Sequence, residues 1–245
     1  KGHRAERERA DRLAIVAAAQ QATAGVRAPQ QGAARRRLGD AALREVLEQG
    51  APVQIDLPHD RHPSFALATE RLEDGAATVG VVKDAGDDPD VTHGALVSAR
   101  VSHGEPGSGV VFRAGEGVGT VTKPGLPLPV GEPAINPMPR QFIRAHVAAV
   151  AARHGGTGDV VVEVSVENGA ELARRTWNPR LGILGGLSIL GTTGVVVPYS
   201  CSSWIDSIRR GIDVARAAGH QHVAGCTGST SERVVAELYG LPEDA

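Results

Sequence analysis

The chain has 245 residues, of which 41% are hydrophobic and only 3% are aromatic, so aliphatic side chains must build its core. This length suits one large domain or two small ones. The formal net charge of −2 argues against a general nucleic-acid binder. No run of about 18 apolar residues is present to cross a membrane. The two cysteines, Cys201 and Cys226, lack a metal-ligand spacing and fit free thiols in a reducing, cytoplasmic setting.

The first half of the chain changes from helical to β periodicity. Residues 1–40 form an Ala-, Gln- and Arg-rich extension that we expect to be helical or partly disordered, and Ala41–Gln49 fits a helix that stops at Gly50. Strand candidates then follow at Val53–Leu57, Phe65–Leu72, Ala77–Val82, Ala95–Val101 and Val110–Phe112. Gly, Pro and Asp fill the turns between them, so residues 41–139 are predicted to form an α+β domain with a mostly antiparallel sheet.

A proline-rich segment over residues 123–139, which we call the strap, ends this domain. Because proline fixes φ and removes backbone donors, we expect the strap to be extended and semi-rigid. Beyond the strap, helix and strand patterns alternate. The expected helices are Arg140–His154, Ala170–Thr176, Ser200–Ala218 and one ending at Tyr239, and the expected strands are Asp159–Val166, Gly194–Val197 and Gln221–Gly225. This alternation predicts an α/β, Rossmann-like domain with a largely parallel sheet over residues 140–245.

Four carboxylates crowd the segment 83–94, directly after the Ala77–Val82 strand. They are Asp84, Asp87, Asp88 and Asp90, with Lys83 before them and His93 after them. Carboxylates this close repel one another unless solvent, a metal or cations take up the charge. A charged loop at the end of a strand is a common place for a site, and the alternative is a solvated acidic turn.

Two loops of the second half could hold a ligand, since open parallel sheets bind ligands beyond the carboxyl ends of their strands. The Gly/Ser/Thr loop 227–232 offers amides and hydroxyls to an anion or a ribose, unless its serines only cap the following helix. The loop 178–194 has five glycines and almost no charge, which indicates backbone that another group approaches closely. Neither loop has the Gly-Lys-Ser/Thr of a phosphate-binding P-loop or the Gly-x-Gly-x-x-Gly dinucleotide pattern.

Arginines gather in the second half as Arg174-Arg175, Arg180 and Arg209-Arg210. Arginine forks bind carboxylates with two hydrogen bonds, so a substrate with many carboxylates would suit them. The alternative is a set of exposed helix-face arginines.

Four longer blocks are more specific than these loops. They cover residues 82–94, 115–126, 131–137 and 178–182 continuing through 191–194. Through these blocks the chain resembles the CbiD family of cobalt-precorrin-5B C1-methyltransferases, from roughly Val53 to its end. The resemblance implies an α+β domain followed by a Rossmann-like one, and it implies that the family continues beyond the position of Ala245, so we expect the second domain to be incomplete here.

The resemblance also implies a reaction. S-adenosyl-L-methionine would donate a methyl group to C1 of cobalt-precorrin-5B, giving cobalt-precorrin-6A in anaerobic cobalamin biosynthesis. Cobalt would arrive only as part of the substrate, so no metal site of the protein is required. Methyl transfer from a sulfonium depends on alignment and desolvation more than on a reactive side chain, which agrees with the lack of a catalytic triad in the sequence.

Site roles follow from the resemblance as hypotheses. The catalytic candidates are Asp87 and His93. The cofactor-binding candidates are Asn178, Gly191, Thr192, Thr193, Gly225, Thr227, Gly228 and Ser229. The substrate-binding candidates are Lys83, Asp84, Asp88, Asp90, Glu116, Lys123 and Arg180.

An alternative function is a tetrapyrrole-binding or carrier protein of the same pathway without turnover. It is favoured by residues 23–28, Thr-Ala-Gly-Val-Arg-Ala, where the family has a Thr-Thr-Gly-Thr-Cys-Ala-like segment. A second alternative is another nucleotide-dependent enzyme built on the Rossmann-like half. The expected partner is a small tetrapyrrole rather than nucleic acid or a membrane, and the sequence leaves open whether the chain forms a homo-oligomer.

Overall fold

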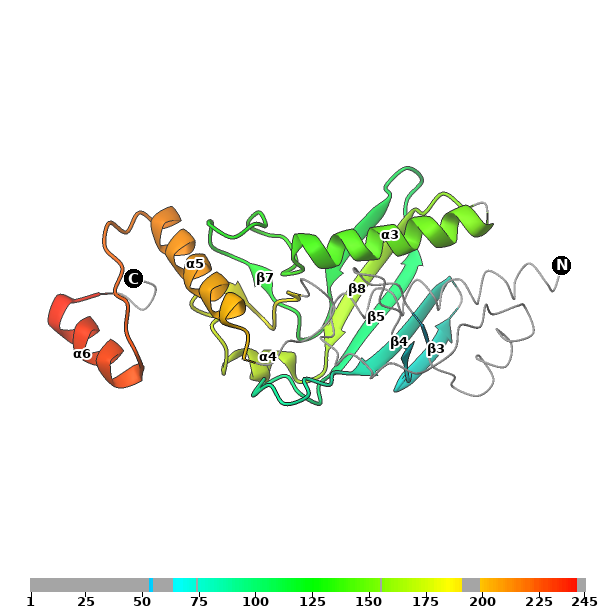
Figure 1. Cartoon of the computed structure of the whole chain (residues 1–245). Helices are drawn as coiled ribbons and strands as arrows, with labels where there is room; N and C mark the ends of the chain where they lie inside the picture. The colour runs from blue at the N-terminus through cyan, green and yellow to red at the C-terminus, as the bar shows by residue number, and fades with distance from the viewer. Residues whose placement is uncertain (1–52, 55–63, 74, 155, 191–198, 242–245) are drawn as a thin grey trace.

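The computed structural model describes residues 53–54, 64–73, 75–154, 156–190 and 199–241 (Figure 1). The strands are β1 Val53–Gln54, β2 Ser64–Phe65, β3 Thr69–Glu73, β4 Ala76–Val82, β5 Leu96–His103, β6 Val110–Ala114, β7 Thr120–Val121, β8 Val160–Val166 and β9 Ile183–Leu184. The helices are α3 Pro137–His154, α4 Gly169–Ala173, α5 Cys201–Ala217 and α6 Ser229–Tyr239. The helix expected at 41–49 and the strand expected at 194–197 lie outside the described residues.

A five-stranded mixed sheet forms the centre of the molecule, in the order β3-β4-β5-β8-β6. Its pairs are antiparallel except β6 with β8, which are parallel. The predicted Val-rich strand β8 therefore forms, but it lies between β5 and β6, two strands from before the strap. Strands from both sides of the expected boundary at residue 139 thus share one sheet, and the division into domains stays a prediction.

Helix α3 covers one face of this sheet, and Figure 1 shows it lying across the strands. Ile143, Val147 and Val150 recur at helical spacing and pack into one buried cluster with the strand residues of that face. Those strand residues include Val79, Val101, Phe112, Val162 and Val164. At the end of the helix near β6, the guanidinium groups of Arg140 and Arg144 lie 5.1 and 4.9 Å from the ring centre of Phe112.

The strap 123–139 is packed onto the body rather than spanning a gap. Leu128 and Ala134 from the strap form a small buried cluster with Val121 and Ile183 of the β7–β9 pair. Arg140 holds the strap's end, because its Nε donates to the Ile135 carbonyl at 2.7 Å and its guanidinium pairs with Glu132 at 2.8 Å.

Within the described residues of the second half, the helices form without the expected parallel sheet. Gln221–Gly225 is irregular, so the prediction of a strand there was wrong. Only Val223 and Ala224 are apolar in this segment, and most of it is exposed, so no buried neighbour pairs with its backbone in the described structure. In the same part of the chain β9 pairs antiparallel with β7. The described fold is therefore α/β with a mixed sheet.

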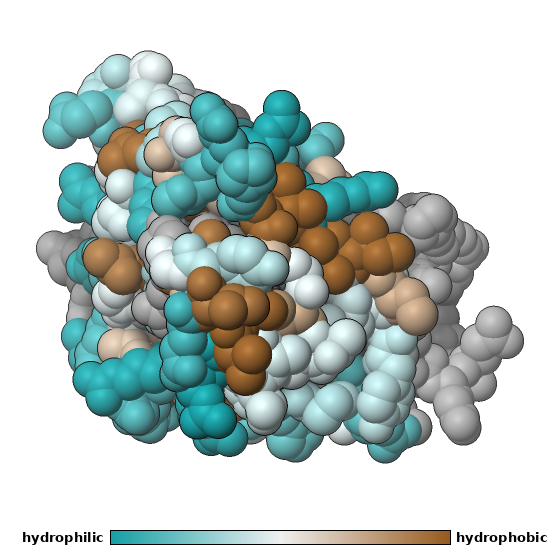
Figure 2. Space-filling model, turned by 90° about the vertical axis from the view of Figure 1, so that its left-hand side faces the viewer, coloured by the Kyte–Doolittle hydropathy of each residue, from teal (hydrophilic) through white to brown (hydrophobic). Residues whose placement is uncertain are grey.

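Helices α5 and α6 form one end of the molecule and expose many apolar side chains, which Figure 2 shows gathered on that face. The exposed set includes Trp204, Ile205 and Ile208 of α5 and Val234, Leu238 and Tyr239 of α6. Ser200 caps α5, accepting a hydrogen bond from the Ser203 N–H at 3.4 Å. Among the helices that the structure describes, none is long and apolar enough to span a membrane.

Candidate functional site

The strands β4, β6 and β8 run in the same direction and end at the same edge of the sheet. This follows because β5 is antiparallel to both β4 and β8, while β6 is parallel to β8. The segments that follow them, 83–94, 115–119 and 167–168, therefore meet at one edge. Two hydrogen bonds join the segments 115–119 and 167–168 to neighbouring strands, from the Val166 N–H to the Glu116 carbonyl and from the Glu167 N–H to the Leu96 carbonyl.

One half of the acidic loop is held together by Lys83. Its Nζ donates to Asp90 Oδ2 at 2.5 Å and to Thr92 Oγ1 at 2.6 Å. The backbone N–H and the hydroxyl of Thr92 both donate to Asp90 Oδ1. Burial raises the pKa of Asp90, but the hydrogen bonds from Lys83 and Thr92 outweigh it and bring the pKa below its usual value. Lys83 and Asp90 thus shape the loop by binding each other.

The other carboxylates of the loop are more exposed. Asp84 Oδ1 accepts from the Gly86 N–H at 2.8 Å and lies 3.8 Å from His93 Nδ1. His93 Nδ1 itself accepts from the Ala85 N–H at 3.1 Å. This bond fixes the tautomer with its proton on Nε2, so in this arrangement the ring offers a donor, not a free lone pair. The catalytic role given to His93 stays a prediction that this geometry does not favour.

Asp87 and Asp88 belong to the same turn of the acidic loop, and Asp88 is half-buried. Asp87 is exposed at the edge of the sheet. Asp88 Oδ1 accepts from the Tyr199 N–H at 3.1 Å, which links the acidic loop to the residue just before α5's cap. The acidic loop therefore contacts the start of the C-terminal helices.

In the glycine-rich segment 178–190, Gly186 packs against backbone and Gly182 against the Lys123 side chain, while Gly185 has open space around it. A Cβ on Gly186 would overlap the Gly117 carbonyl, and one on Gly117 would overlap the Val166 carbonyl. Asn178 is buried and holds this segment from inside, because its Nδ2 donates to the Gly186 carbonyl and its Oδ1 accepts from Ser188. The group that approaches Gly182 and Gly186 is thus the chain itself. Asn178 does not line the cavity described next.

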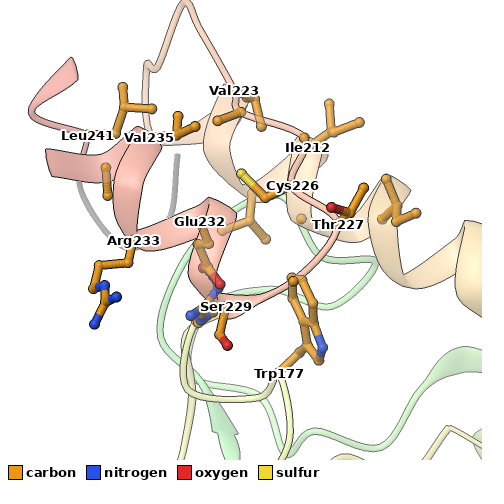
Figure 3. A pocket seen from close by; sticks show the side chains of 18 of the residues that line it. Trp177, Ile212, Val223, Cys226, Thr227, Ser229, Glu232, Arg233, Val235 and Leu241 are labelled. Carbon is orange, nitrogen blue, oxygen red and sulfur yellow. Dashed lines mark hydrogen bonds and ion pairs between the residues drawn. The ribbon is translucent and has the colours of Figure 1, made fainter. Parts of the chain in front are cut away.

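A cavity of about 940 Å³ lies between α5, α6 and the turn 177–181 (Figure 3). Its apolar wall comes from Ile208 and Ile212 of α5 and from Val223 and Val235. In Figure 3, Trp177 lies on the side opposite Val223 and Val235, facing the segment that carries Thr227 and Ser229. The predicted residues Arg180, Gly225, Thr227, Gly228 and Ser229 all line this cavity.

The first turn of α6 opens into the cavity without a side-chain cap. Gly228 is the N-cap residue and supplies no side-chain acceptor, and the Ser231 hydroxyl donates to the Gly228 carbonyl instead of accepting. The interpretation of these serines as helix caps was therefore wrong. Uncapped N–H groups at a helix start attract anions, because they add to the positive end of the helix dipole.

Arg180 connects this helix to the body. Its guanidinium forms an ion pair with Glu232 of α6 and lies 5.4 Å from the ring centre of Trp177. Its carbonyl accepts from Lys123 Nζ at 3.5 Å, and the Lys123 stem occupies the space where Gly182 would carry a Cβ. Lys123 and Arg180 are thus brought together, although Arg180 sits at the cavity wall and Lys123 supports it from the strap.

The predicted site residues fall into separate groups. The acidic residues and Glu116, which is exposed, lie at the sheet edge, while the residues of the 225–229 turn line the cavity. Gly191, Thr192 and Thr193 lie outside the described residues. Sequence reasoning missed Trp177 and Glu232, the latter because its spacing from the serines matched a capping pattern. Within the described part of the chain, no three His, Cys, Asp or Glu side chains gather as a metal site would require.

Comparison with known proteins gives the family. The CbiD family model matches residues 16–198. The cobalt-precorrin-5B C(1)-methyltransferase of Paramagnetospirillum magneticum is 66% identical over 194 residues, covering 79% of this chain and 54% of that protein. The protein of the same name from Bradyrhizobium sp. is 65% identical over 195 residues, covering 80% of this chain and 52% of its own.

A crystal structure of the cobalamin biosynthesis protein cbiD from Archaeoglobus fulgidus is also similar, with 24% identity and a TM-score of 0.48 over 92% of this chain and 66% of that one. The chain spans about half the length of the curated relatives it matches. Because the family model matches well over half of its residues, the chain belongs to the CbiD family.

Proposed function

We propose that this chain takes part in the transfer of a methyl group from S-adenosyl-L-methionine to C1 of cobalt-precorrin-5B, which gives cobalt-precorrin-6A in cobalamin biosynthesis. The observation that carries the proposal is the 66% identity to a relative named for this methyl transfer. We assign the reaction to the cavity between α5 and α6. The proposal concerns the whole family protein, of which this chain spans about half.

We place the methyl donor in the cavity. Its volume of about 940 Å³ lies within the range of small-molecule pockets. The N–H groups of the first α6 turn suit the carboxylate of the donor, and the apolar wall and Trp177 suit its adenine. Glu232 at the rim could accept from ribose hydroxyls. When bound there, S-adenosyl-L-methionine would supply an electrophilic methyl group on its sulfonium.

The protein's part is then to orient the partners and to exclude water. Fixed orientation of two reactants is worth about 7–11 kcal/mol of the barrier, so no nucleophilic side chain is needed. Glycine backbone at 117, 169 and 186 packs closely and joins the sheet edge to the start of α4 and to the residues after β9. Asp87 remains our proposed acceptor for a proton released by the ring, since it is exposed at that edge.

We also propose that in the longer family proteins α5 and α6 belong to a Rossmann-like domain. An amphipathic helix normally buries its apolar face, and here Trp204, Ile208 and Leu238 are more than half exposed. A further layer of that domain would cover them. Circular dichroism and thermal melting of this chain beside a full-length relative test this, because the added layer should raise the melting temperature of the helical signal.

Mass spectrometry of the corrinoid after incubation with S-adenosyl-L-methionine and the protein tests the reaction. The expected result is replacement of one hydrogen by one methyl group, with S-adenosylhomocysteine as co-product. A full-length relative run in parallel shows whether the shorter chain suffices. A protein that binds tetrapyrrole but neither binds S-adenosylhomocysteine nor methylates would be a carrier, and the proposal would fail.

A further inference from the structure

The face of the main sheet opposite α3 carries three arginines in one row. Strand register places Arg71 beside Thr78, Thr78 beside Arg100, Arg100 beside Glu163, and Glu163 beside Arg113. Directly paired residues on neighbouring strands project from the same face, so these five side chains form a line across all five strands. We call this line the arginine row. It holds three cations and one carboxylate.

The spacing of the arginine row is regular. Arg71, Arg100 and Arg113 are exposed, and each is two strands from the next. Neighbouring strands lie about 4.8 Å apart, so the three arginines project from points about 10 Å apart. One small anion cannot engage all three, whereas a molecule with several separated carboxylates can.

A second row of small polar residues runs alongside, one step closer to the edge where β4, β6 and β8 end. Register and packing place Thr69, Gly80, Ser98, Ser165 and Gly115 in this line, which we call the hydroxyl row. The Ser98 hydroxyl lies 2.9 Å from where a Cβ of Gly80 would sit, and the Thr69 hydroxyl is closer still. The Ser165 hydroxyl occupies the same position over Gly115. The glycines thus leave a surface without large side chains, where hydroxyl donors lie beside the guanidinium groups.

A solvent-facing sheet surface is ordinarily polar, and opposite charges on directly paired residues stabilise it, as Glu163 does between Arg100 and Arg113. Here one carboxylate stands among three arginines, although the chain as a whole carries a net charge of −2. Arg71 and Arg100 already interact with other groups of the chain. A guanidinium carries five N–H donors, so an existing partner leaves donors that a ligand carboxylate can share.

We propose that the arginine row binds the carboxylate arms of a small polycarboxylate, which under the proposed function is the tetrapyrrole substrate. The inference rests on that function for the identity of the ligand and on the strand register for the site. Under this proposal the carboxylate arms of the ligand do not bind Lys83, because its Nζ already donates to Asp90 and Thr92. The hydroxyl row lies between the arginine row, where the carboxylate arms would bind, and the sheet edge that carries Asp87.

The test uses the 245-residue chain and two porphyrins as probes. Uroporphyrin carries more carboxylates than coproporphyrin on a similar ring, and binding of either is followed by fluorescence. In the double variant Arg100→Gln/Arg113→Gln we expect uroporphyrin to bind about a hundred-fold more weakly, roughly ten-fold for each lost charged hydrogen-bonding group. The affinity for coproporphyrin should fall less than the affinity for uroporphyrin. When Arg113 is replaced by Lys instead of Gln, part of the lost affinity for uroporphyrin should return, because lysine keeps the positive charge although it lacks the planar guanidinium.

The matched control is Arg174→Gln/Arg216→Gln, which removes two exposed arginines from other surfaces. Affinity for S-adenosylhomocysteine and the thermal melt should be unchanged in both double variants. The inference is overturned if the row variant binds uroporphyrin as wild type does, if the control loses as much, or if the wild type binds no uroporphyrin. Porphyrin binding that depends on the row, without any binding of S-adenosylhomocysteine, would overturn the proposed function and leave the polycarboxylate site standing.

Discussion

Arg180 and Glu232 form an ion pair across 52 positions of sequence, and this pair joins the turn before β9 to the first turn of α6. Stacking of Arg180 over Trp177 holds the guanidinium in place on the body's side. The pair therefore sets the position of the uncapped helix start relative to Trp177. The cavity between them depends on that position.

Breaking this pair should weaken ligand binding more than folding. Both side chains are about one-third exposed, so each single change should cost only about 0.5–1 kcal/mol of unfolding free energy. Arg180→Gln and Glu232→Gln should each reduce the affinity for S-adenosylhomocysteine several-fold, because α6 loses its tether. The exchanged pair Arg180→Glu/Glu232→Arg should recover part of the affinity. Calorimetry would contradict this if the singles bind as wild type does.

Asp90 should make stability depend on pH in the acid range. Its pKa is lowered in the folded protein, so its contribution is fully present above the unfolded pKa and is lost as the pH falls through the folded one. Near pH 7, Asp90→Asn should cost about 2 kcal/mol, since the carboxylate accepts charged and neutral hydrogen bonds while partly buried. The difference from wild type in urea unfolding should shrink below about pH 4. A difference that stays constant at all pH values would contradict the account.

Asp159 should organise the turn between β5 and β6. Its two carboxylate oxygens accept from the Gly107 and Gly109 N–H groups at 3.0 and 2.7 Å. A hydrogen bond involving Thr157 and these two backbone bonds bring the pKa of Asp159 below its usual value. In Asp159→Ala, amide hydrogen exchange at Gly107 and Gly109 should accelerate while the core of β4 keeps its protection. Ser108→Ala, in the same turn, should leave the exchange rates unchanged, and equal effects of both would refute this role.

Gly117 should tolerate no side chain. It adopts a φ of +74°, and a Cβ there would overlap the Val166 carbonyl. We expect Gly117→Ala to cost about 3 kcal/mol from strain and overpacking together. Gly211→Ala is the matched control, because its Cβ meets nothing and helix α5 should gain about 0.5–1 kcal/mol from alanine. Equal free energies of unfolding in urea for the two variants would show that the backbone around Gly117 is not tightly packed.

Local patterns predicted most elements but not their partners. The Val-rich run of β8 was recognised as a strand, yet periodicity carries no information about its neighbours, and it pairs with β5 and β6 instead of a sheet of its own half. The prediction of a strand at Gln221–Gly225 was wrong because two apolar residues are too few to indicate a buried strand. The antiparallel pairing of β3, β4 and β5 was predicted correctly, because these strands alternate between a core face and a polar face. The first half does not form a sheet of its own, since β6 pairs in parallel with β8.

The candidate site was predictable only in part for the same reason. The turn 225–229 was identified from its glycines and hydroxyls, and it lines the cavity. Trp177 joins it across about fifty residues, which no local pattern reveals. The acidic loop was identified by its charge, but charge alone could not show that Lys83 and Asp90 satisfy each other. The arginine row exists only through the register of five strands.

The most direct measurement is calorimetric titration of S-adenosylhomocysteine into wild type and Gly228→Asp. Gly228 has extended backbone with open space at its Cβ, so aspartate fits and caps α6. Its carboxylate would occupy the anion position at the helix start. We expect the wild type to bind, and Gly228→Asp to bind at least about ten-fold more weakly while melting no lower. Equal binding by the two proteins, or no binding by the wild type, would contradict a methyl-donor site between α5 and α6.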